Sequence, residues 1–188
     1  MSSTLISRFA IPHCKQTRTY VDVGANDGDT SHPFVDLFDT VVAFEPNPNT
    51  FKKLITNTKI QAHQCALMDH ESTVTLQIPN ITNNPAHGSV APRRQSKWQE
   101  TTSHTVQGTT LDSFKLQGVD LIKIDVEQGE LEVIRGALNT IMISRPVIMF
   151  ENKRNENQTV IDLLLKLNYH IAHHLRSDVI MKPNKQGA

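Results

Sequence analysis

Alternation between two kinds of segment is the feature that most constrains the fold of this chain. From Tyr20 onward, short β-rich runs end near glycine or acidic residues, and polar turns then lead into stretches with helical periodicity. This order is typical of βαβ crossovers around a parallel sheet. The strand candidates are mostly apolar, as buried parallel strands are, and they cover residues 20–23, 41–44, 64–67, 121–124 and 147–150.

The segments between and after these strands predict helices and a final hairpin. Apolar residues at helical spacing predict helices over residues 49–56, 131–144 and 158–167. Asn168 is placed to end the last of them. Two β-like runs follow, His170 to Leu175 and Val179 to Lys182, with turn residues between them. We expect these runs to form an antiparallel pair appended to the parallel sheet.

The length of 188 residues fits one domain, which we assign to residues 19–188, with residues 1–18 as an N-terminal arm. The arm contains Arg8, Lys15 and Arg18 and no acidic residue, which fits either a short helix packed on the domain or a transit peptide. The polar segment 79–104 lacks regular patterning, and we interpret it as a long loop that could serve as a substrate lid.

Composition excludes several classes of protein. The 19 Lys and Arg residues balance the 19 Asp and Glu residues, so net charge gives no support to a nucleic-acid partner. No apolar run approaches the ~20 residues needed to cross a bilayer, so we expect no membrane span. The two cysteines, Cys14 and Cys65, are too few and too far apart for a disulfide framework. We therefore expect structural thiols in a cytoplasmic protein.

The first strand ends in a turn with the spacing G-x-x-x-G, from Gly24 to Gly28. Such a turn lets a ligand approach the backbone and the start of a helix. The second strand ends in Glu45, 21 positions after Gly24, where a carboxylate in such folds accepts the two hydroxyl groups of a ribose. Turn and acid together predict a ligand that contains adenosine.

The charge of the turn favours one ligand over another. A dinucleotide site of the G-x-G-x-x-G type holds an anionic pyrophosphate, whereas this turn has a different spacing and carries Asp22, Asp27 and Asp29. Negative charge suits the amino group and sulfonium of S-adenosylmethionine (SAM). We interpret the turn as a SAM site, although Asp27 and Asp29 also suit the N-terminus of a helix.

These motifs resemble those of the FkbM-type SAM-dependent methyltransferases, which have a Rossmann-like class I fold. The resemblance spans most of the chain, and its elements occur in the family's order: residues 21–28, 43–48, 65–69, 110–114, 120–127 and 145–151. It implies an α/β fold with a mostly parallel seven-stranded sheet, flanked by helices and carrying a C-terminal antiparallel strand pair. One departure is that the family usually reads Glu-Gly-Ala-Glu where this chain has Glu127-Gln128-Gly129-Glu130.

The resemblance also implies the residues of a cofactor site. Asp22, Gly24, Asn26 and Gly28 would line the methionine end of SAM, and Glu45 would hold the ribose. The third strand would place Ala66 and Leu67 near the adenine. The neighbouring residues that we include in the predicted cofactor site are Ala25, Thr30, Pro46, Asn47 and Asp125.

Acidic residues at the ends of the fourth and fifth strands are the candidates for catalysis. Open α/β sheets bind ligands at the carboxyl ends of their strands, and Asp125, Glu127 and Glu151 occupy those ends. We expect Glu130 to be an exposed helix residue. Lys123 lies within an apolar strand, and we predict that it pairs with an acid. A required metal ion is not implied by the resemblance.

The long loop supplies further candidates. His87 and His104 bracket it and are possible general bases, and Ser89 lies in the small polar segment that the family tends to carry. The cluster Arg93-Arg94 with Lys97 and Trp98 could follow a phosphate backbone and stack a base. A solvated loop is the more common explanation of such a cluster.

The leading hypothesis is a methyltransferase that acts on a hydroxyl group of a glycan or small molecule. Two alternatives remain open, which are a nucleic-acid ribose 2′-O-methyltransferase and a SAM-binding module without catalysis. The glycine spacing and the acidic turn disfavour a nicotinamide oxidoreductase. The sequence leaves the acceptor and the oligomeric state undetermined.

Overall fold

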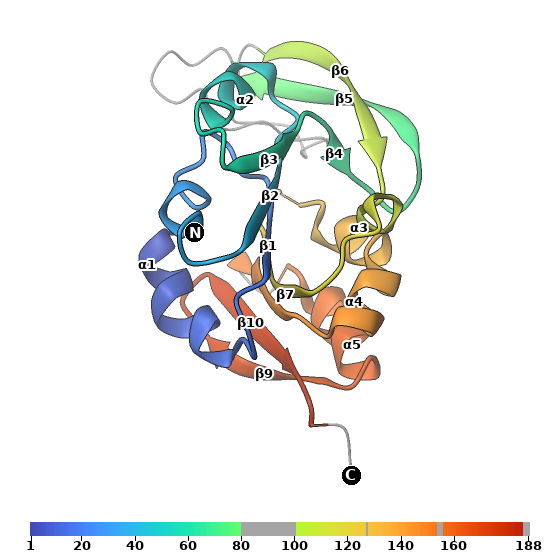
Figure 1. Cartoon of the computed structure of the whole chain (residues 1–188). Coiled ribbons are helices and arrows are strands. Elements are labelled where there is room, and N and C mark those ends of the chain that lie inside the picture. The colour runs from blue at the N-terminus through green and yellow to red at the C-terminus, as the bar shows by residue number, and fades with distance from the viewer. Residues whose placement is uncertain (80–100, 127, 154–155, 186–188) are drawn as a thin grey trace.

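A seven-stranded sheet forms the centre of the computed structural model, which describes residues 1–79, 101–126, 128–153 and 156–185 (Figure 1). The strand order is β3-β2-β1-β7-β8-β10-β9. Neighbouring strands are parallel from β3 to β8, whereas β10 is antiparallel to both β8 and β9. The strands are β1 (Thr19–Val23), β2 (Thr40–Phe44), β3 (Ile60–His63), β7 (Val119–Ile124), β8 (Val147–Glu151), β9 (Tyr169–His174) and β10 (Asp178–Pro183). The predicted fold class and the C-terminal antiparallel pair are confirmed.

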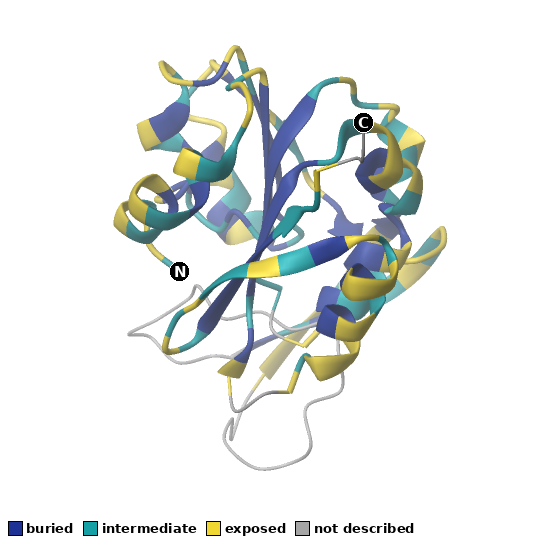
Figure 2. Ribbon diagram, turned by 90° about the horizontal axis from the view of Figure 1, so that it is seen from below, coloured by how far each residue is buried: buried dark blue, intermediate teal, exposed yellow. Residues whose placement is uncertain are grey.

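Helices cover both faces of this sheet, and the buried strands lie between them (Figure 2). One face packs on α3 (Glu130–Arg135), α4 (Leu138–Ser144) and α5 (Gln158–Lys166) through residues such as Ile134, Ile141 and Leu164. The other face packs on α2 (Pro48–Leu54) and on the N-terminal segment. Asn168 has a left-handed backbone, with φ of 62°, just after α5, as the predicted helix end requires.

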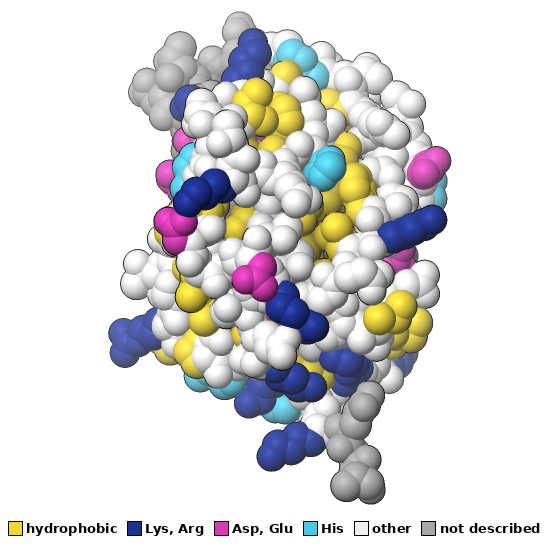
Figure 3. Space-filling view, in the orientation of Figure 1, with side chains coloured by type: hydrophobic (Ala, Val, Ile, Leu, Met, Phe, Trp, Pro, Cys, Tyr) yellow, Lys and Arg dark blue, Asp and Glu magenta, His cyan; other side chains and the backbone are white. Residues whose placement is uncertain are grey.

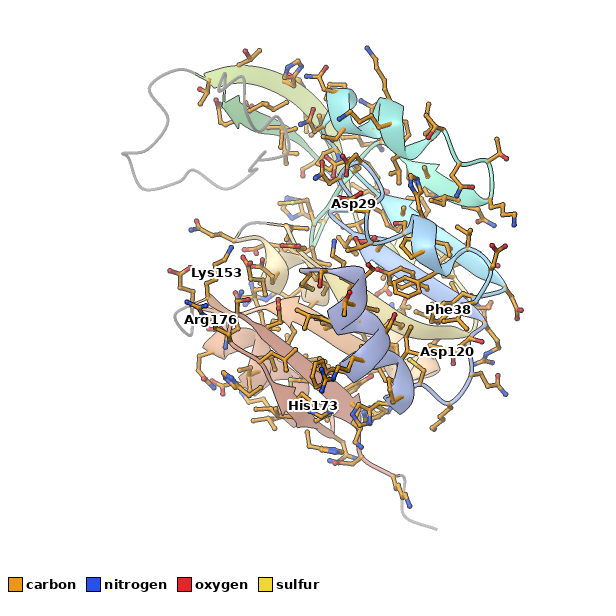
Figure 4. The ribbon with its side chains drawn as sticks, turned by 90° about the vertical axis from the view of Figure 1, so that its left-hand side faces the viewer. Asp29, Phe38, Asp120, Lys153, His173 and Arg176 are labelled. Atoms are coloured by element: carbon orange, nitrogen blue, oxygen red, sulfur yellow. The ribbon has the colours of Figure 1, made fainter. Side chains whose placement is uncertain are left out.

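The N-terminal arm is part of the packed structure. It forms the short turns α1 (Ser3–Leu5), η1 (Ile6–Ala10) and η2 (Ile11–His13), and Ile6 and Ala10 are fully buried. Phe9 and His13 contact the ring of His173 in β9, with centroids 5.3 and 5.1 Å away (Figure 4). In this structure the N-terminal residues therefore form short helical turns that pack on the sheet. In the described part of the chain, no helix has the length and apolar character needed to span a membrane.

The predicted third strand was wrong in its position. The strand of the main sheet is β3, four residues earlier, whereas Ala66–Leu67 forms β4 in a separate three-stranded sheet with the order β4-β6-β5. The apolar run looked like a sheet strand because Cys65 and Leu67 are buried in the main core while Ala66 is buried in a second core. This segment connects two cores, and the polar residues of β3 hid the true strand at the sheet edge.

The predicted loop over residues 79–104 was wrong at both ends. Pro79 ends β5 (Ser72–Pro79), and residues 101–104 belong to β6 (Thr101–Thr109), which pairs with β5 in antiparallel register. Leu76, Ile78 and Val106 give these strands a small core. The Thr-rich sequence of β6 suits a strand that is exposed over its first half. Residues 80–100, which include His87, Ser89 and the basic cluster at 93–98, lie outside the described residues.

Candidate functional site

The turn after β1 has the backbone conformation that its glycines predict. Gly24, Asn26 and Gly28 all have positive φ, of 75°, 55° and 96°. The N–H groups of Gly24 and Ala25 both donate to the carbonyl of Phe44, which joins the turn to β2. A Cβ atom on Gly24 would lie 2.2 Å from the carbonyl oxygen of Asp125, so the turn also fits tightly against the end of β7.

Glu45 connects this turn to the segment after β2. Its two carboxylate oxygens accept one backbone N–H each, from Asn26 and from Asn47, both at 2.8 Å. Burial raises the pKa of Glu45, while these two N–H donors act in the opposite direction. A hydrogen bond from the Thr50 side chain also favours the charged form of Glu45. A carboxylate at this place in such a fold suits a pair of neighbouring hydroxyl groups such as those of a ribose.

Asp22 is fully buried below the turn, and its partners are all side chains of the protein. Thr30 Oγ1 and Ser31 Oγ donate to Oδ2 at 2.8 and 2.6 Å. Lys123 Nζ lies 2.8 Å from Oδ1, because Asp22 and Lys123 are register partners on adjacent strands. The prediction that Lys123 pairs with an acid is confirmed.

Lys123 makes two further contacts. Its ammonium donates to the carbonyl of Gly24 at 2.9 Å and lies 3.9 Å from Asp125 Oδ2. Burial lowers the pKa of Lys123, but the charges of Asp22 and Asp125 outweigh burial, and the net pKa is raised. One buried cation therefore joins β1, the glycine turn and the end of β7.

The candidate catalytic acids differ in their surroundings. Asp125 is part-buried, with 23% of its side chain exposed, and the Met1 amino group lies 3.1 Å from its Oδ2. Glu151 Oε1 forms an ion pair with Lys153 Nζ at 2.6 Å. Glu127 lies outside the described residues. Figure 4 shows Lys153 and Asp120 on opposite sides of the view, with Asp29 above and between them, and Asp120 lies near the amino end of β7.

Glu130 was predicted to be exposed, and this was wrong, because only 1% of its surface is accessible. It begins α3 and shares a helix face with Val133 and Ile134, which pack into the main core. That spacing was the available signal. Burial raises the pKa of Glu130, and its Oε2 has no hydrogen-bond partner in the part of the chain that the structure describes.

Two more buried polar residues lie near Glu151. Asn152 follows β8, and Asp178 begins β10 opposite Glu151. Asn152 Nδ2 and Asp178 Oδ1 have no hydrogen-bond partner within the described ranges. Burial also raises the pKa of Asp178. The sequence predicts Asp178 only as a turn residue, because turn composition carries no information on burial.

The remaining predicted site residues come before and after β3 in the sequence. Asn47 begins α2 and its Oδ1 accepts the N–H of Asn49 at 3.0 Å, and Pro46 precedes it. Ala66 and Leu67 are buried in β4. His104 lies in β6 opposite Leu76. Among the described residues, no three His, Cys, Asp or Glu side chains are grouped so that they could hold a metal ion.

A cavity of about 350 Å³ lies at the edge of β3. It is lined by Ala62, His63, Gln64, Cys65, Gln107, Thr109 and Phe114. The His63 ring stacks on Phe44 and contacts Phe114, with centroids 5.2 and 4.7 Å away. Figure 3 shows hydrophobic side chains in a hollow on this face of the molecule. Burial raises the pKa of Cys65 to about 11, so its thiol is protonated at neutral pH.

Comparison with known proteins identifies one family. The model of the Methyltransferase FkbM domain matches residues 22–171. Methyltransferase 1 of Beauveria bassiana is 31% identical over 120 residues, which cover 52% of this chain and 48% of that protein. Hexuronic acid methyltransferase AglP of Haloferax volcanii is 27% identical over 150 residues, which cover 77% of this chain and 60% of that protein. The chain thus spans about half to three fifths of the length of these relatives.

Solved structures share the fold at low sequence identity. Methyltransferase FkbM from Methylobacillus flagellatus has a TM-score of 0.58 and 18% identity, over 88% of this chain and 43% of that chain. SMU.1697c of Streptococcus mutans, solved in complex with SAH, has a TM-score of 0.55 and 8% identity, over 96% of this chain and 94% of that chain. These similarities support the arrangement of strands described above.

Proposed function

This chain belongs to the FkbM methyltransferase family, and from that premise we propose that it transfers a methyl group from SAM to a hydroxyl group of a glycan or small molecule. The observation that carries the proposal is the positive-φ turn held against Glu45 at the carboxyl end of the parallel strands. Open α/β sheets bind nucleotide-like ligands at this edge.

The residues present fit SAM. The turn is acidic, and Asn26 Oδ1 is a buried acceptor without a hydrogen-bond partner in the described part of the chain. We assign the ribose of SAM to Glu45. The residues that we place around the methionine end are Asp22, Gly24, Ala25, Asn26, Gly28, Thr30 and Asp125. The residues that we place around the adenosine are Pro46, Asn47, Ala66 and Leu67. Asp22 and Thr30 act here by shaping the turn, since each is bonded to the other below it.

The chemistry divides simply between cofactor and protein. SAM supplies both the methyl group and its leaving group. The chain has to align an acceptor hydroxyl group and remove its proton. We assign these tasks to Asp125, Glu127 and Glu151. The ion pair with Lys153 fixes the orientation of Glu151, and Asp125 lies beside the glycine turn, where the acceptor would meet the cofactor.

A hydroxyl-bearing acceptor is supported by AglP, a relative named as a hexuronic acid methyltransferase. We further propose that residues 19–188 form the catalytic domain with residues 1–18 packed on it. The free thiols of Cys14 and Cys65 support a cytoplasmic location.

Isothermal titration calorimetry with SAM tests the cofactor assignment. We expect the protein to bind SAM and Glu45→Gln to weaken binding by about tenfold or more, because the amide would present N–H donors to a site built from N–H donors and hydroxyl groups. Glu71→Gln, an exposed exchange of the same type, is the matched control and should leave affinity unchanged.

Two results would contradict the proposal. The first is a folded protein that does not bind SAM, and the second is equal affinity in the Glu45 and Glu71 variants. If SAM binds, transfer of its labelled methyl group is then measured to neutral sugars, uronic acids and RNA. Transfer to RNA alone would replace the glycan assignment by the nucleic-acid alternative.

A further inference from the structure

Lys123 pairs with Asp22 in the interior, next to the proposed cofactor site. We propose that its buried ammonium sets how strongly the cofactor site favours the charged sulfur of SAM over the neutral sulfur of the product, S-adenosylhomocysteine (SAH). This inference rests on the proposed function, because it assumes that the glycine turn holds the methionine end of SAM. It concerns the balance of charge in the site, which neither the family nor its relatives specify.

The position of Lys123 is the first step of the argument. Its Nζ lies within 3 Å of Asp22 Oδ1 and of the Gly24 carbonyl, so it sits directly below the turn. Asp125, on the other side of that turn, is 3.9 Å away. The ammonium of Lys123 therefore lies beneath the proposed binding site of the sulfonium, and the backbone of the turn separates the two charges.

Burial is the second step. The Lys123 side chain is 3% exposed and that of Asp22 is fully buried, so solvent does little to screen either charge. Asp22, Glu45 and Asp125 are the acids that act on Lys123, and they all favour its charged form. A group with this many acidic neighbours keeps its proton across the neutral pH range.

The sum of these charges gives the effect. The acids of the site attract the sulfonium of SAM, while Lys123 offsets the charge of Asp22 and the Met1 amino group lies 3.1 Å from Asp125. SAH has no charge on sulfur, so its affinity is nearly independent of this balance. Without the cancellation, the site would hold SAM more tightly relative to SAH. With a surplus of positive charge, the site would hold SAH more tightly and the product would leave slowly.

Removal of Lys123 alone would leave Asp22 buried without a counter-ion, which is a large penalty on folding. The informative pair is Asp22→Asn and the double variant Asp22→Asn with Lys123→Met. The Asn side chain still accepts from Thr30 and Ser31, and Met has a similar volume to Lys without its charge. Relative to the unmodified protein, the first variant gains one positive charge and the second keeps the net charge.

The measurement is the ratio of the dissociation constants for SAH and SAM, obtained by titration calorimetry on all three proteins at pH 7.5. We expect Asp22→Asn to shift the ratio about tenfold toward SAH, as one unit charge at roughly 10 Å does in a partly buried site. The double variant should return the ratio to within about threefold of the unmodified protein, even if both ligands bind more weakly.

A purely structural role of Lys123 predicts a different result. Distortion of the turn would weaken SAM and SAH in parallel, and the ratio would be the same in all three proteins. That outcome would overturn the inference while leaving the proposed function intact. Absence of SAM and SAH binding by the unmodified protein would instead remove the proposed function, on which the inference depends.

Discussion

The carboxyl edge of the sheet has two halves, and the buried carboxylates of the two halves differ in their hydrogen-bond partners. In the first half, formed by Asp22 in β1, the turn 24–31 and residues 45–47, each oxygen of Asp22 and Glu45 has a partner within 3 Å, which for Asp22 Oδ1 is the ion pair with Lys123. Among the described residues, the unpartnered atoms of this half, Asn26 Oδ1 and Asp27 Oδ1, lie in the glycine turn itself. In the second half, formed by residues 125–130, 151–152 and 177–178, Glu130 and Asp178 each leave one oxygen without a hydrogen-bond partner in the described chain. The adjacent Asn152 Nδ2 lacks one as well.

This difference teaches what each half contributes. A carboxylate whose lone pairs are held by backbone N–H groups and a lysine is fixed before any ligand arrives, which reduces the cost of ordering the site. Buried polar atoms without partners cost stability, and such costs concentrate at functional sites. The carboxylates of Asp22 and Glu45 are thus preorganised, whereas Glu130 and Asp178 are buried with part of their hydrogen-bonding capacity unused in the described chain.

The largest expected effect comes from breaking the first half at its tightest point. Gly24→Ala places a Cβ 2.2 Å from the Asp125 carbonyl and imposes strain at a φ of 75°. We expect a loss of about 3 kcal/mol in the free energy of unfolding, together with loss of SAM binding. Thermal unfolding and calorimetry measure both quantities.

Gly129→Ala in the second half is the matched control for Gly24→Ala. Its φ is −114°, and a new Cβ would lie 3.4 Å from Val126 Cγ2, an ordinary contact distance. This substitution also introduces the alanine that the family usually carries at this position. Equal losses of stability in the two variants would show that the two halves do not differ in tightness.

An intermediate effect is expected from Glu130→Gln. Burial raises the pKa of Glu130 above the value of the unfolded chain, so the folded state favours the protonated acid. The stability contributed by that protonation is present below the unfolded pKa and is lost as pH rises through the folded pKa. Glutamine has no carboxyl group that ionises, so the variant does not lose stability in this way as pH rises.

The unfolding free energy of Glu130→Gln relative to the unmodified protein should therefore increase from pH 4.5 upward, reaching about 1 kcal/mol in favour of the variant. Urea denaturation over a pH series measures the difference, with the exposed Glu71→Gln as the flat reference. A difference that shrinks as pH rises would mean that Glu130 is held in its ionised form, like the acids of the first half.

The smallest effect is expected at Gln128, which has a φ of 83° where the family usually has glycine. Gln128 is exposed, so relief of backbone strain is the main consequence of Gln128→Gly. The gain is reduced by the greater entropy of glycine in the unfolded chain, and we expect a net stabilisation of about 0.5 kcal/mol. Differential scanning calorimetry should detect a rise of about 2 °C in Tm, and a fall would argue against strain at this turn.

Much of the fold could be predicted because its signals are local. The continuous apolar strands, the helix that ends before Asn168, and the pairing of Lys123 all follow from residue type and spacing, and the structure confirms them. The third strand was misplaced because burial of Cys65 and Leu67 comes from a junction between two cores. Periodicity indicates that a residue is buried, but it does not indicate which sheet buries that residue.

The candidate site divides in the same way. The residues of the glycine turn and Glu45 were found from their motifs, and their roles with SAM remain predictions. The burial of Glu130 and Asp178 was missed because they come from separate elements, and only the packing of α3 and β10 buries them.

The sequence by itself determined the class of fold, the family and the conformation of the turn, since these depend on short-range patterns and on the freedom of glycine. The tertiary structure decided which charged groups are paired, buried or exposed. Whether Lys123 neutralises Asp22, and whether Glu130 faces solvent or lies in the interior, depends on contacts between segments far apart in the chain. Burial and distance fix the energy of a charge, and neither is written in the sequence around it.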